Sequence, residues 1–274
     1  MRRDPVPLPV QPVRRPQTPF PTIVVGTDGS DSAERALDHV VRLAERTGAR
    51  IVVTHAYRRP RHPDAVRELG SSLLRDAAAR YGATVPCRVA LREGRAAEAL
   101  AEVAVSEGAS LIATGNRGLG GRRVSIGTVP NRIAHGAPTN VLIVQTLRDV
   151  TTEPYGRVLI ATDGSPTATR AAEIGASLAG AVGAPALVLH VGDPRRGDEV
   201  LTRALHELEG PPEIDAQTVE GDPAGRIVEV AEEEDCDLIV LGNQGMTGAR
   251  RFTGSVPSRV AARALGHVLV VKTT

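Results

Sequence analysis

Two glycine-rich stretches contain the residue types that could bind a phosphate. They read GNRGLGGRRVSIGTVP at residues 115–130 and GNQGMTGARRFTGSVP at residues 242–257. In each, eight residues separate the second glycine of G-x-x-G from the glycine that precedes a threonine or serine. Each stretch follows an apolar run and leads into a predicted helix, an arrangement that aims backbone N–H groups at phosphate oxygens. The sequence therefore predicts two phosphate-binding loops.

The two loops belong to a repeat that spans most of the chain. IVVGTDGS at 23–30 is echoed by VLIATDGS at 158–165, and GRAAEAL at 94–100 by GDPAGRI at 221–227. NVLIV at 140–144 is likewise echoed by HVLVV at 267–271. Because the matching segments keep their order over more than a hundred residues, they indicate duplicated domains. We expect domains at residues 21–146 and 156–274, a polar linker at 147–155, and a proline-rich tail at 1–20.

Composition and charge argue against some classes of protein but do not identify the function. The 274 residues carry a formal net charge of +1, which gives no general case for binding nucleic acid. No apolar run approaches the about 20 residues that span a bilayer, and the N-terminus lacks the apolar core of a signal peptide. The two cysteines, Cys87 and Cys236, make no disulfide framework and fit a reducing cytoplasm. Aromatic residues are scarce, so the cores must consist mainly of Val, Leu, Ile and Ala.

Short apolar runs rich in β-branched residues alternate with alanine-rich helical patterns. The strands are expected near 22–27, 50–56, 85–91, 110–114 and 140–145, then near 157–161, 185–191, 214–220, 237–241 and 267–272. The helices are expected near 31–47, 64–81, 96–107 and 128–135, then near 166–182, 198–209, 223–234 and 255–264. This α/β order predicts, in each repeat, a doubly wound parallel sheet with helices on both faces.

Together these features resemble the universal stress protein family. An Asp follows the first strand, G-x-x-G follows the fourth, and Gly, a hydroxyl residue, Val and Pro begin the last helix. The resemblance covers residues 21–272 and implies tandem flavodoxin-like domains of strand order 3-2-1-4-5 that bind an adenine nucleotide. It departs at one point, because the family has nine residues between the second and third glycines, where each repeat here has eight.

The ligand is expected where the strand order reverses, beyond the carboxyl ends of the first and fourth strands. By resemblance, the Asp contacts the nucleoside and the second strand lines the adenine pocket; glycines and the hydroxyl-led helix start suit the phosphates. Since Arg117 in the first loop corresponds to Gln244 in the second, the first repeat should hold a triphosphate more tightly. The nucleotide-binding residues are expected to be Gly26, Thr27, Asp28, Val53, Gly115, Arg117, Gly118, Gly127, Thr128, Val129, Asp163, Val188, Gly242, Gln244, Gly245, Gly254, Ser255 and Val256.

Several residues have structural alternatives. D-G-S after a strand is often only a turn that caps the next helix, and G-x-x-G can serve turn geometry alone. His55 and His190, at matching ends of the second strands, are not expected to be catalytic. Arg123 and Arg250 could neutralise phosphate or remain solvated.

No catalytic set emerges from the sequence. It contains no G-x-x-x-x-G-K-[ST] loop, no G-x-S-x-G elbow and no metal-ligand cluster. The leading hypothesis is a cytoplasmic ATP-binding sensor that signals by conformation, with Mg²⁺ held, if at all, through the phosphates. The alternatives are an interaction protein that acts through dimer contacts without nucleotide, which the short loops favour, and a slow ATPase.

The last strand of each repeat should lie at a sheet edge. An apolar edge is a liability unless it is paired, and by resemblance family members pair through this strand. We therefore expect an internal pseudo-dimer of the two repeats through residues 141–144 and 268–271. Two chains could associate further as a homodimer.

Overall fold

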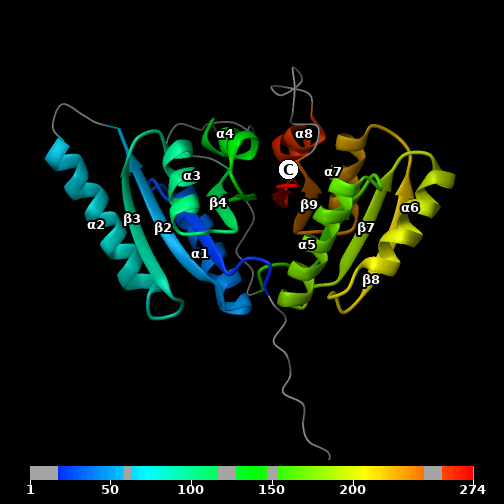
Figure 1. Cartoon of the computed structure of the whole chain (residues 1–274), viewed down its shortest axis with the longest axis horizontal. Helices are drawn as coiled ribbons and strands as arrows, with labels where there is room; N and C mark the ends of the chain where they lie inside the picture. The colour runs from blue at the N-terminus through cyan, green and yellow to red at the C-terminus, as the bar shows by residue number, and fades with distance from the viewer. Residues whose placement is uncertain (1–17, 59–62, 117–127, 147–152, 244–254, 274) are drawn as a thin grey trace, which may run out of the picture.

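The computed structural model describes residues 18–58, 63–116, 128–146, 153–243 and 255–273. Strands and helices alternate in both repeats, as predicted (Figure 1). The first repeat comprises β1 (Thr22–Gly26), α1 (Asp31–Thr47), β2 (Arg50–Tyr57), α2 (Pro63–Tyr81), β3 (Cys87–Glu93), α3 (Ala96–Ser106), β4 (Leu111–Gly115), α4 (Thr128–Gly136) and β5 (Asn140–Val144). The second comprises β6 (Val158–Ala161), α5 (Pro166–Val182), β7 (Ala186–Val191), α6 (Pro194–Glu207), β8 (Ile214–Val219), α7 (Pro223–Glu233), β9 (Leu238–Gly242), α8 (Val256–Arg263) and β10 (His267–Val271).

Local signals set most of the element boundaries. Helix α1 begins after Ser30, whose hydroxyl accepts a hydrogen bond from a first-turn amide, and it ends at Gly48 in a left-handed conformation. Ser165 and Gly183 do the same for α5. The largest departure from the predicted boundaries is α6, which begins at Pro194 instead of residue 198. It starts earlier because the Asp193 carboxylate accepts two amide hydrogen bonds from the first turn.

All these strands form one sheet in the order β3-β2-β1-β4-β5-β10-β9-β6-β7-β8. Within each repeat the neighbouring strands are parallel and follow the order 3-2-1-4-5. This arrangement confirms the doubly wound fold that the sequence predicts. The central strands are buried on both faces, whereas β3 and β8, at the two outer edges, are partly exposed.

The two repeats join through β5 and β10, which pair antiparallel. Leu142 lies opposite Leu269, and both side chains are buried. The ends of the pair are closed symmetrically: His267 Nδ1 accepts from the amide of Gln145 at 3.0 Å, and Asn140 Oδ1 accepts from the amide of Lys272 at 2.9 Å. The pairing confirms the predicted internal pseudo-dimer. We call the β5–β10 pair the seam.

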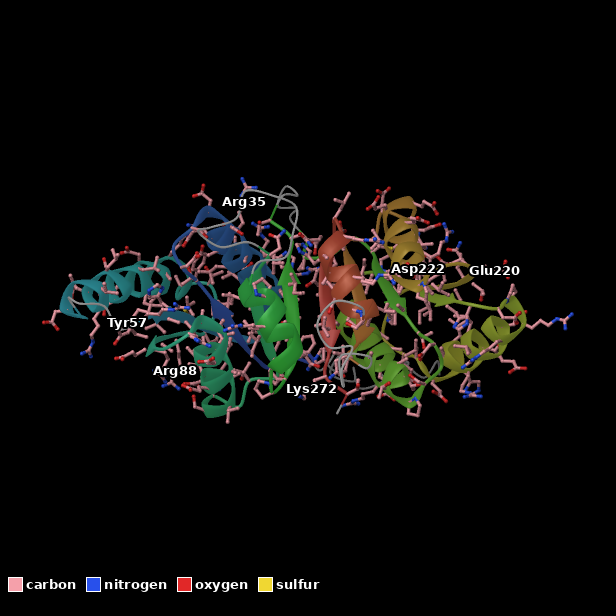
Figure 2. All side chains as sticks on the ribbon, turned by 90° about the horizontal axis from the view of Figure 1, so that it is seen from above. Arg35, Tyr57, Arg88, Glu220, Asp222 and Lys272 are labelled. Atoms are coloured by element: carbon pink, nitrogen blue, oxygen red, sulfur yellow. The ribbon has the colours of Figure 1, made fainter. Side chains whose placement is uncertain are left out.

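Four of the described helices cover each face of the sheet. One buried apolar cluster joins α1, α2, α5 and α6 to one face, and a second joins α3, α4, α7 and α8 to the other. Each cluster contains residues of both repeats, so the core continues across the seam. Helices α4 and α8 lie on either side of the seam in both views (Figures 1 and 2).

Two aromatic residues outside the predicted domains are buried. Phe20, assigned to the tail, is only 1% exposed and belongs to the core. Tyr155, assigned to the linker, is 2% exposed, and its hydroxyl lies 3.2 Å from Nε2 of His39 in α1. Large apolar side chains gain most from burial, and the polar composition of the neighbouring residues concealed this gain.

Candidate functional site

A D-G-S turn ends the first strand of each repeat. Asp28 Oδ1 accepts hydrogen bonds from the amide and the hydroxyl of Ser30, at 3.1 and 2.5 Å. Asp163 Oδ1 accepts from the amide of Ser165 at 2.9 Å. Gly29 has a φ of +77°, a left-handed conformation that glycine adopts at little cost. The turn therefore has the structural role that D-G-S often plays, and it also fixes a carboxylate beside the N-terminus of the next helix.

The histidines on the second strands support these turns. His55 Nδ1 lies 3.0 Å from the carbonyl oxygen of Thr27, and His190 Nδ1 lies 3.0 Å from that of Thr162. Since a carbonyl oxygen can only accept a hydrogen bond, Nδ1 carries the hydrogen in both rings. These contacts give both histidines a structural role at the end of the first strand.

A cavity of about 190 Å³ opens where the strand order of the second repeat reverses. Asp163 lines it from the turn, Gly242 from the end of β9, and Val256 from the start of α8. The fold thus brings together three of the predicted nucleotide-binding residues. The wall also contains Ala161, Thr162, Ser165, Thr167, Ala168, Leu189, Val191, Pro223, Ile227, Leu241 and Pro257.

The start of α8 has the geometry predicted for it. Ser255 is the N-cap residue, and its hydroxyl accepts from the amide of Ser258 at 3.4 Å. Pro257 lies in the first turn, where its missing N–H costs little. In the first repeat, Thr128 is itself the first residue of α4, and Val129 packs partly buried against the core.

The surroundings of Gly242 leave room for a ligand. A Cβ at this position would lie 3.4 Å from the nearest protein atom, an ordinary van der Waals distance. Neither packing nor backbone conformation requires a glycine here, so the fold itself does not require one at this position. A glycine in the cavity wall is therefore consistent with a ligand that approaches the backbone closely.

Gly26 differs from Gly242 in this respect. A Cβ at Gly26 would lie 2.9 Å from Cδ1 of Leu100 in α3. The absence of a Cβ at Gly26 therefore allows α3 to pack on β1. The sequence alone did not reveal this structural reason for a glycine. In the second repeat Ala161 occupies the matching position and lines the cavity. Thr27 is buried, and its Oγ1 accepts from the amide of Gly29 at 3.2 Å.

The side chains of the predicted second-strand residues face the core. Val53 and Val188 are fully buried in the cluster under α1, α2, α5 and α6. On this strand of the second repeat, Leu189 and Val191 line the cavity. Adjacent residues of a strand face opposite sides of a sheet, so a shift of one residue moves a side chain to the other face.

The sequence interpretation missed an asparagine in each repeat. Asn116 Oδ1 accepts from the hydroxyl of Thr146 at 2.8 Å, and Asn243 Oδ1 accepts from the hydroxyl of Thr273 at 2.7 Å. Each asparagine follows the fourth strand and holds the segment after the fifth, at the base of a glycine-rich stretch. The signal was present, because G-N opens both copies of the loop.

The other predicted residues are placed only in part. Gly115 is buried at the end of β4, next to β1, where Val25 lies opposite Ala113. Asp28 and Gly115 therefore follow adjoining strands, as the reversal of strand order requires. Six predicted residues lie outside the described ranges: Arg117, Gly118, Gly127, Gln244, Gly245 and Gly254.

An ion pair lies at the rim of the cavity in the second repeat. Arg259 of α8 donates from Nη1 to Asp222 Oδ1 at 2.8 Å, and its Nη2 donates to Asp222 Oδ2. Asp222 (labelled in Figure 2) is also the N-cap of α7, because its Oδ2 accepts from the amide of Gly225. The bonds from Arg259 and then from Gly225 hold the pKa of this carboxyl below its usual value. Asp222 precedes the cavity-lining Pro223, so the pair bridges the starts of two helices that frame the cavity.

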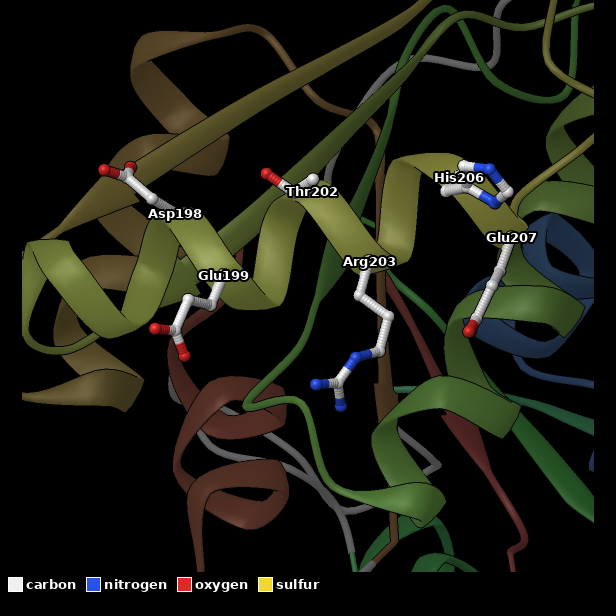
Figure 3. A pocket seen from close by; sticks show the side chains of 6 residues that line it. All are labelled: Asp198, Glu199, Thr202, Arg203, His206 and Glu207. Atoms are coloured by element: carbon white, nitrogen blue, oxygen red, sulfur yellow. The ribbon is translucent and has the colours of Figure 1, made fainter.

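A larger but shallower depression, of about 540 Å³, runs along the outer surface of α6 (Figure 3). Its lining consists of side chains of that one helix: Asp198, Glu199, Thr202, Arg203, His206 and Glu207. No strand end or helix start contributes to it, and most of its charges are acidic. We therefore place the candidate site at the smaller cavity, where several elements converge.

Other kinds of chemistry find little support in the described ranges. Within them, no group of three or more His, Cys, Asp or Glu side chains could hold a metal ion. Cys87 and Cys236 are free thiols, and burial raises the pKa of both, that of Cys236 to about 12. None of the helices that the structure describes has the length and apolar character needed to cross a membrane.

Comparison with known proteins agrees with the duplicated fold. The model of the universal stress protein family matches residues 19–145, 154–210 and 196–272. A universal stress protein of Mycobacterium tuberculosis is 33% identical over 143 residues, covering 44% of this chain and 98% of its own length. One of Thermus aquaticus is 36% identical over 138 residues, covering 46% and 99%. Each of these relatives thus has about the size of one repeat.

A solved structure extends the likeness to both repeats. The crystal structure of a universal stress protein from Archaeoglobus fulgidus covers 93% of this chain and 97% of its own, with a TM-score of 0.77 and 22% identity. At that identity the likeness concerns the fold alone, and it includes both halves of the sheet. The family matches in both repeats, together with the repeated turn and helix start, show that this chain belongs to the universal stress protein family in its tandem, two-domain form.

Proposed function

We propose that this protein binds an adenine nucleotide, ATP, where the strand order reverses in each repeat, and that it signals by conformation. The observation that carries the proposal is the cavity that joins Asp163, Gly242 and the start of α8. One carboxylate, one unobstructed glycine and one helix N-terminus meet there, and these groups suit a ribose, a phosphate approach and a phosphate, respectively.

The rest of the cavity wall fits the nucleoside end of such a ligand. Leu189, Val191, Ile227 and Leu241 are apolar, whereas the polar side chains lie at the D-G-S turn and the start of α5: Thr162, Asp163, Ser165 and Thr167. A mostly apolar pocket with a few convergent polar groups is typical of small-molecule sites. Asp163 Oδ1 is engaged by Ser165, while Oδ2 has no hydrogen bond to a described residue and suits a ribose hydroxyl.

A signal could reach the rest of the molecule through α8. This helix lines the cavity through Val256 and packs on β10, one strand of the seam. A ligand that contacts the start of α8 would favour whichever arrangement of helix and seam binds it better. Efficient turnover is not part of the proposal, because the sequence contains no recognisable catalytic set and the carboxylate that lines the cavity, Asp163, is assigned to the ribose. Mg²⁺, if bound, would be held through the phosphates and one carboxylate.

The alternative function is an interaction protein that does not bind nucleotide. It is favoured by the D-G-S turn, because the hydrogen bonds of Asp28 and Asp163 to the following serines already explain why an aspartate is present. It is also favoured by the glycine-rich stretches, which are one residue shorter than the family pattern. Under this alternative the cavity would be a by-product of the fold.

The first test is mass spectrometry of small molecules released from the purified full-length protein. The second is calorimetric titration of ATP and adenosine into the wild type and into Gly242→Ala. Because a Cβ fits at Gly242 without a clash in the protein, the variant should fold and lose ATP at the second repeat by at least about tenfold. Gly136→Ala is the matched control, since a Cβ there meets nothing within 4 Å.

The two functions predict different results. Nucleotide binding predicts two ATP sites in the wild type and in Gly136→Ala, and only one strong site in Gly242→Ala. No measurable ATP or adenosine binding in the folded wild type would favour the interaction protein. Release of ADP on prolonged incubation would support the slow ATPase.

A further inference from the structure

The rims of the two candidate sites differ in charge at matching positions. Since GRAAEAL at 94–100 aligns with GDPAGRI at 221–227, Arg95 corresponds to Asp222. Since VPNR at 129–132 aligns with VPSR at 256–259, Arg132 corresponds to Arg259. An arginine–aspartate pair in the second repeat is thus replaced by two arginines in the first.

In the second repeat the carboxylate of Asp222 binds the guanidinium group of Arg259. Arg259 makes a two-pronged contact with Asp222, and Asp222 is held in place by capping α7. Two parallel bonds between a guanidinium and a carboxylate fix its orientation as well as its charge. Arg259 is therefore turned toward α7 and neutralised.

In the first repeat the matching cation, Arg132, has no such partner among the residues that the structure describes. Arg95 is the N-cap residue of α3 but makes no side-chain capping bond, and its ion pair with Glu98 is 3.6 Å long and well exposed. Arg132 is exposed, and no ion pair joins it to a described residue. Because α3 packs on α4 as α7 packs on α8, Arg95 and Arg132 occupy in the first repeat the helix positions that Asp222 and Arg259 occupy in the second.

The two aligned positions differ in charge. Arg95 and Arg132 are both positive, whereas Asp222 and Arg259 carry opposite charges; the nearby charges are Glu98 in the first repeat and the Arg226–Glu229 ion pair in the second. Each phosphate added to a nucleoside brings negative charge, so an unpaired guanidinium at the rim favours the more highly phosphorylated ligand. The affinity for the uncharged nucleoside should not depend on this charge.

We propose that the residue at the N-cap of the third helix of each repeat sets which nucleotide its site prefers. Arg95 leaves Arg132 available, so the first repeat prefers a nucleoside triphosphate to the nucleoside. Asp222 sequesters Arg259, so the second repeat prefers the triphosphate less strongly than the first does. The inference rests on the proposed nucleotide sites and adds a difference in ligand preference between them.

The test is a calorimetric titration of ATP and adenosine into the full-length wild type and Asp222→Ser. Serine preserves the cap of α7 but releases Arg259. The weaker ATP site should gain about tenfold in affinity, the scale of one charge-assisted hydrogen bond, while adenosine changes by less than about twofold. The gain should shrink as NaCl rises from about 0.05 to 0.5 M, because salt screens exposed charges.

Two further variants keep the test specific. Asp193→Ser removes a carboxylate cap from α6 and should leave both ligands unaffected, since its bonds are to Arg195 and Arg196 amides outside the cavity wall. Arg95→Asp should lock Arg132 in the first repeat and weaken the stronger ATP site about tenfold.

The outcomes separate this inference from the function on which it rests. If ATP and adenosine bind but neither Asp222→Ser nor Arg95→Asp changes the ratio of their affinities, the proposed difference in ligand preference is wrong and the nucleotide sites stand. If adenosine also changes as much as ATP, the variants act through helix packing and the inference is again wrong. If the wild type binds neither ligand, both proposals fall.

Discussion

At the residue scale, Phe20 shows that a side chain next to a proline-rich segment can belong to the core. Five prolines of residues 1–16 and a sixth just before Phe20 predict an extended tail, yet Phe20 is buried in the core. Its amide also donates to Thr18 Oγ1 at 3.1 Å. In a chain with only two phenylalanines, this ring contributes a large share of the aromatic area in the core.

Phe20→Ala should therefore destabilise the protein as a core substitution does, by about 3–5 kcal/mol. Pro21→Ala, at an exposed neighbouring position, should change the free energy of unfolding by less than about 0.5 kcal/mol. Urea unfolding followed by circular dichroism measures both. A loss below about 1 kcal/mol for Phe20→Ala would mean that the ring is only loosely attached to the core.

At the element scale, the seam joins the repeats through paired strands with no exposed side-chain face. Residues Val141, Leu142 and Ile143 face Val270, Leu269 and Val268, and all six are at most 3% exposed. An unpaired strand of this kind would present bare N–H and C=O groups together with apolar side chains. The pairing removes this liability from both repeats at once.

A lysine in the seam should loosen the attachment of the repeats. Val141→Lys would bury an ammonium group without a partner, and we expect a loss of more than about 3 kcal/mol and faster proteolysis between the repeats. Val89→Lys is the matched control, because Val89 also lies in a strand but is 45% exposed. Equal proteolysis and equal unfolding of the two variants would contradict a stabilising role for the seam.

At the scale of the whole molecule, a buried aromatic cluster links the two repeats beside the seam. The rings of His39 in α1 and His267 in β10 lie 4.1 Å apart, and Tyr155 packs against both. Burial lowers the pKa of His39 well below its ordinary value, and the neighbouring charges of His267 and Arg42 lower it further. Protonation of His39 is therefore unfavourable in the folded chain.

This cluster predicts a loss of stability in mild acid. Between the lowered pKa of His39 in the folded state and about 6.5 in the unfolded state, the unfolded chain binds more protons, so stability rises with pH. The stabilisation is complete above about pH 6.5 and is lost as the pH falls below that value, at up to about 1.4 kcal/mol per pH unit.

Urea unfolding between about pH 7.5 and 5.5 tests this dependence. His39→Phe keeps an aromatic ring but cannot be protonated, so its free energy of unfolding should fall less over the same range. The comparison cancels the carboxylates, which titrate alike in both proteins. Parallel pH profiles would show that His39 is not the group responsible.

Much of the fold could be read from short windows of sequence. Hydrophobic period, the serine caps at Ser30 and Ser165 and the glycines after α1 and α5 act over a few residues, so the pattern alone located the elements. The repeat and its family resemblance then supplied the strand order of each half and the place where that order reverses. For the candidate site, these signals were enough to predict that Asp163, Gly242 and Val256 would meet.

Other features depend on groups that are far apart in the chain. The register of the seam, the face on which Val188 lies, the burial of Phe20 and Tyr155 and the pairing of Arg259 with Asp222 all require the positions of two or more elements at once. A one-residue shift in a strand reverses its faces, and a surface arginine finds its partner only when two helices pack. Such contacts are decided by packing in three dimensions, because no short stretch of sequence contains both partners.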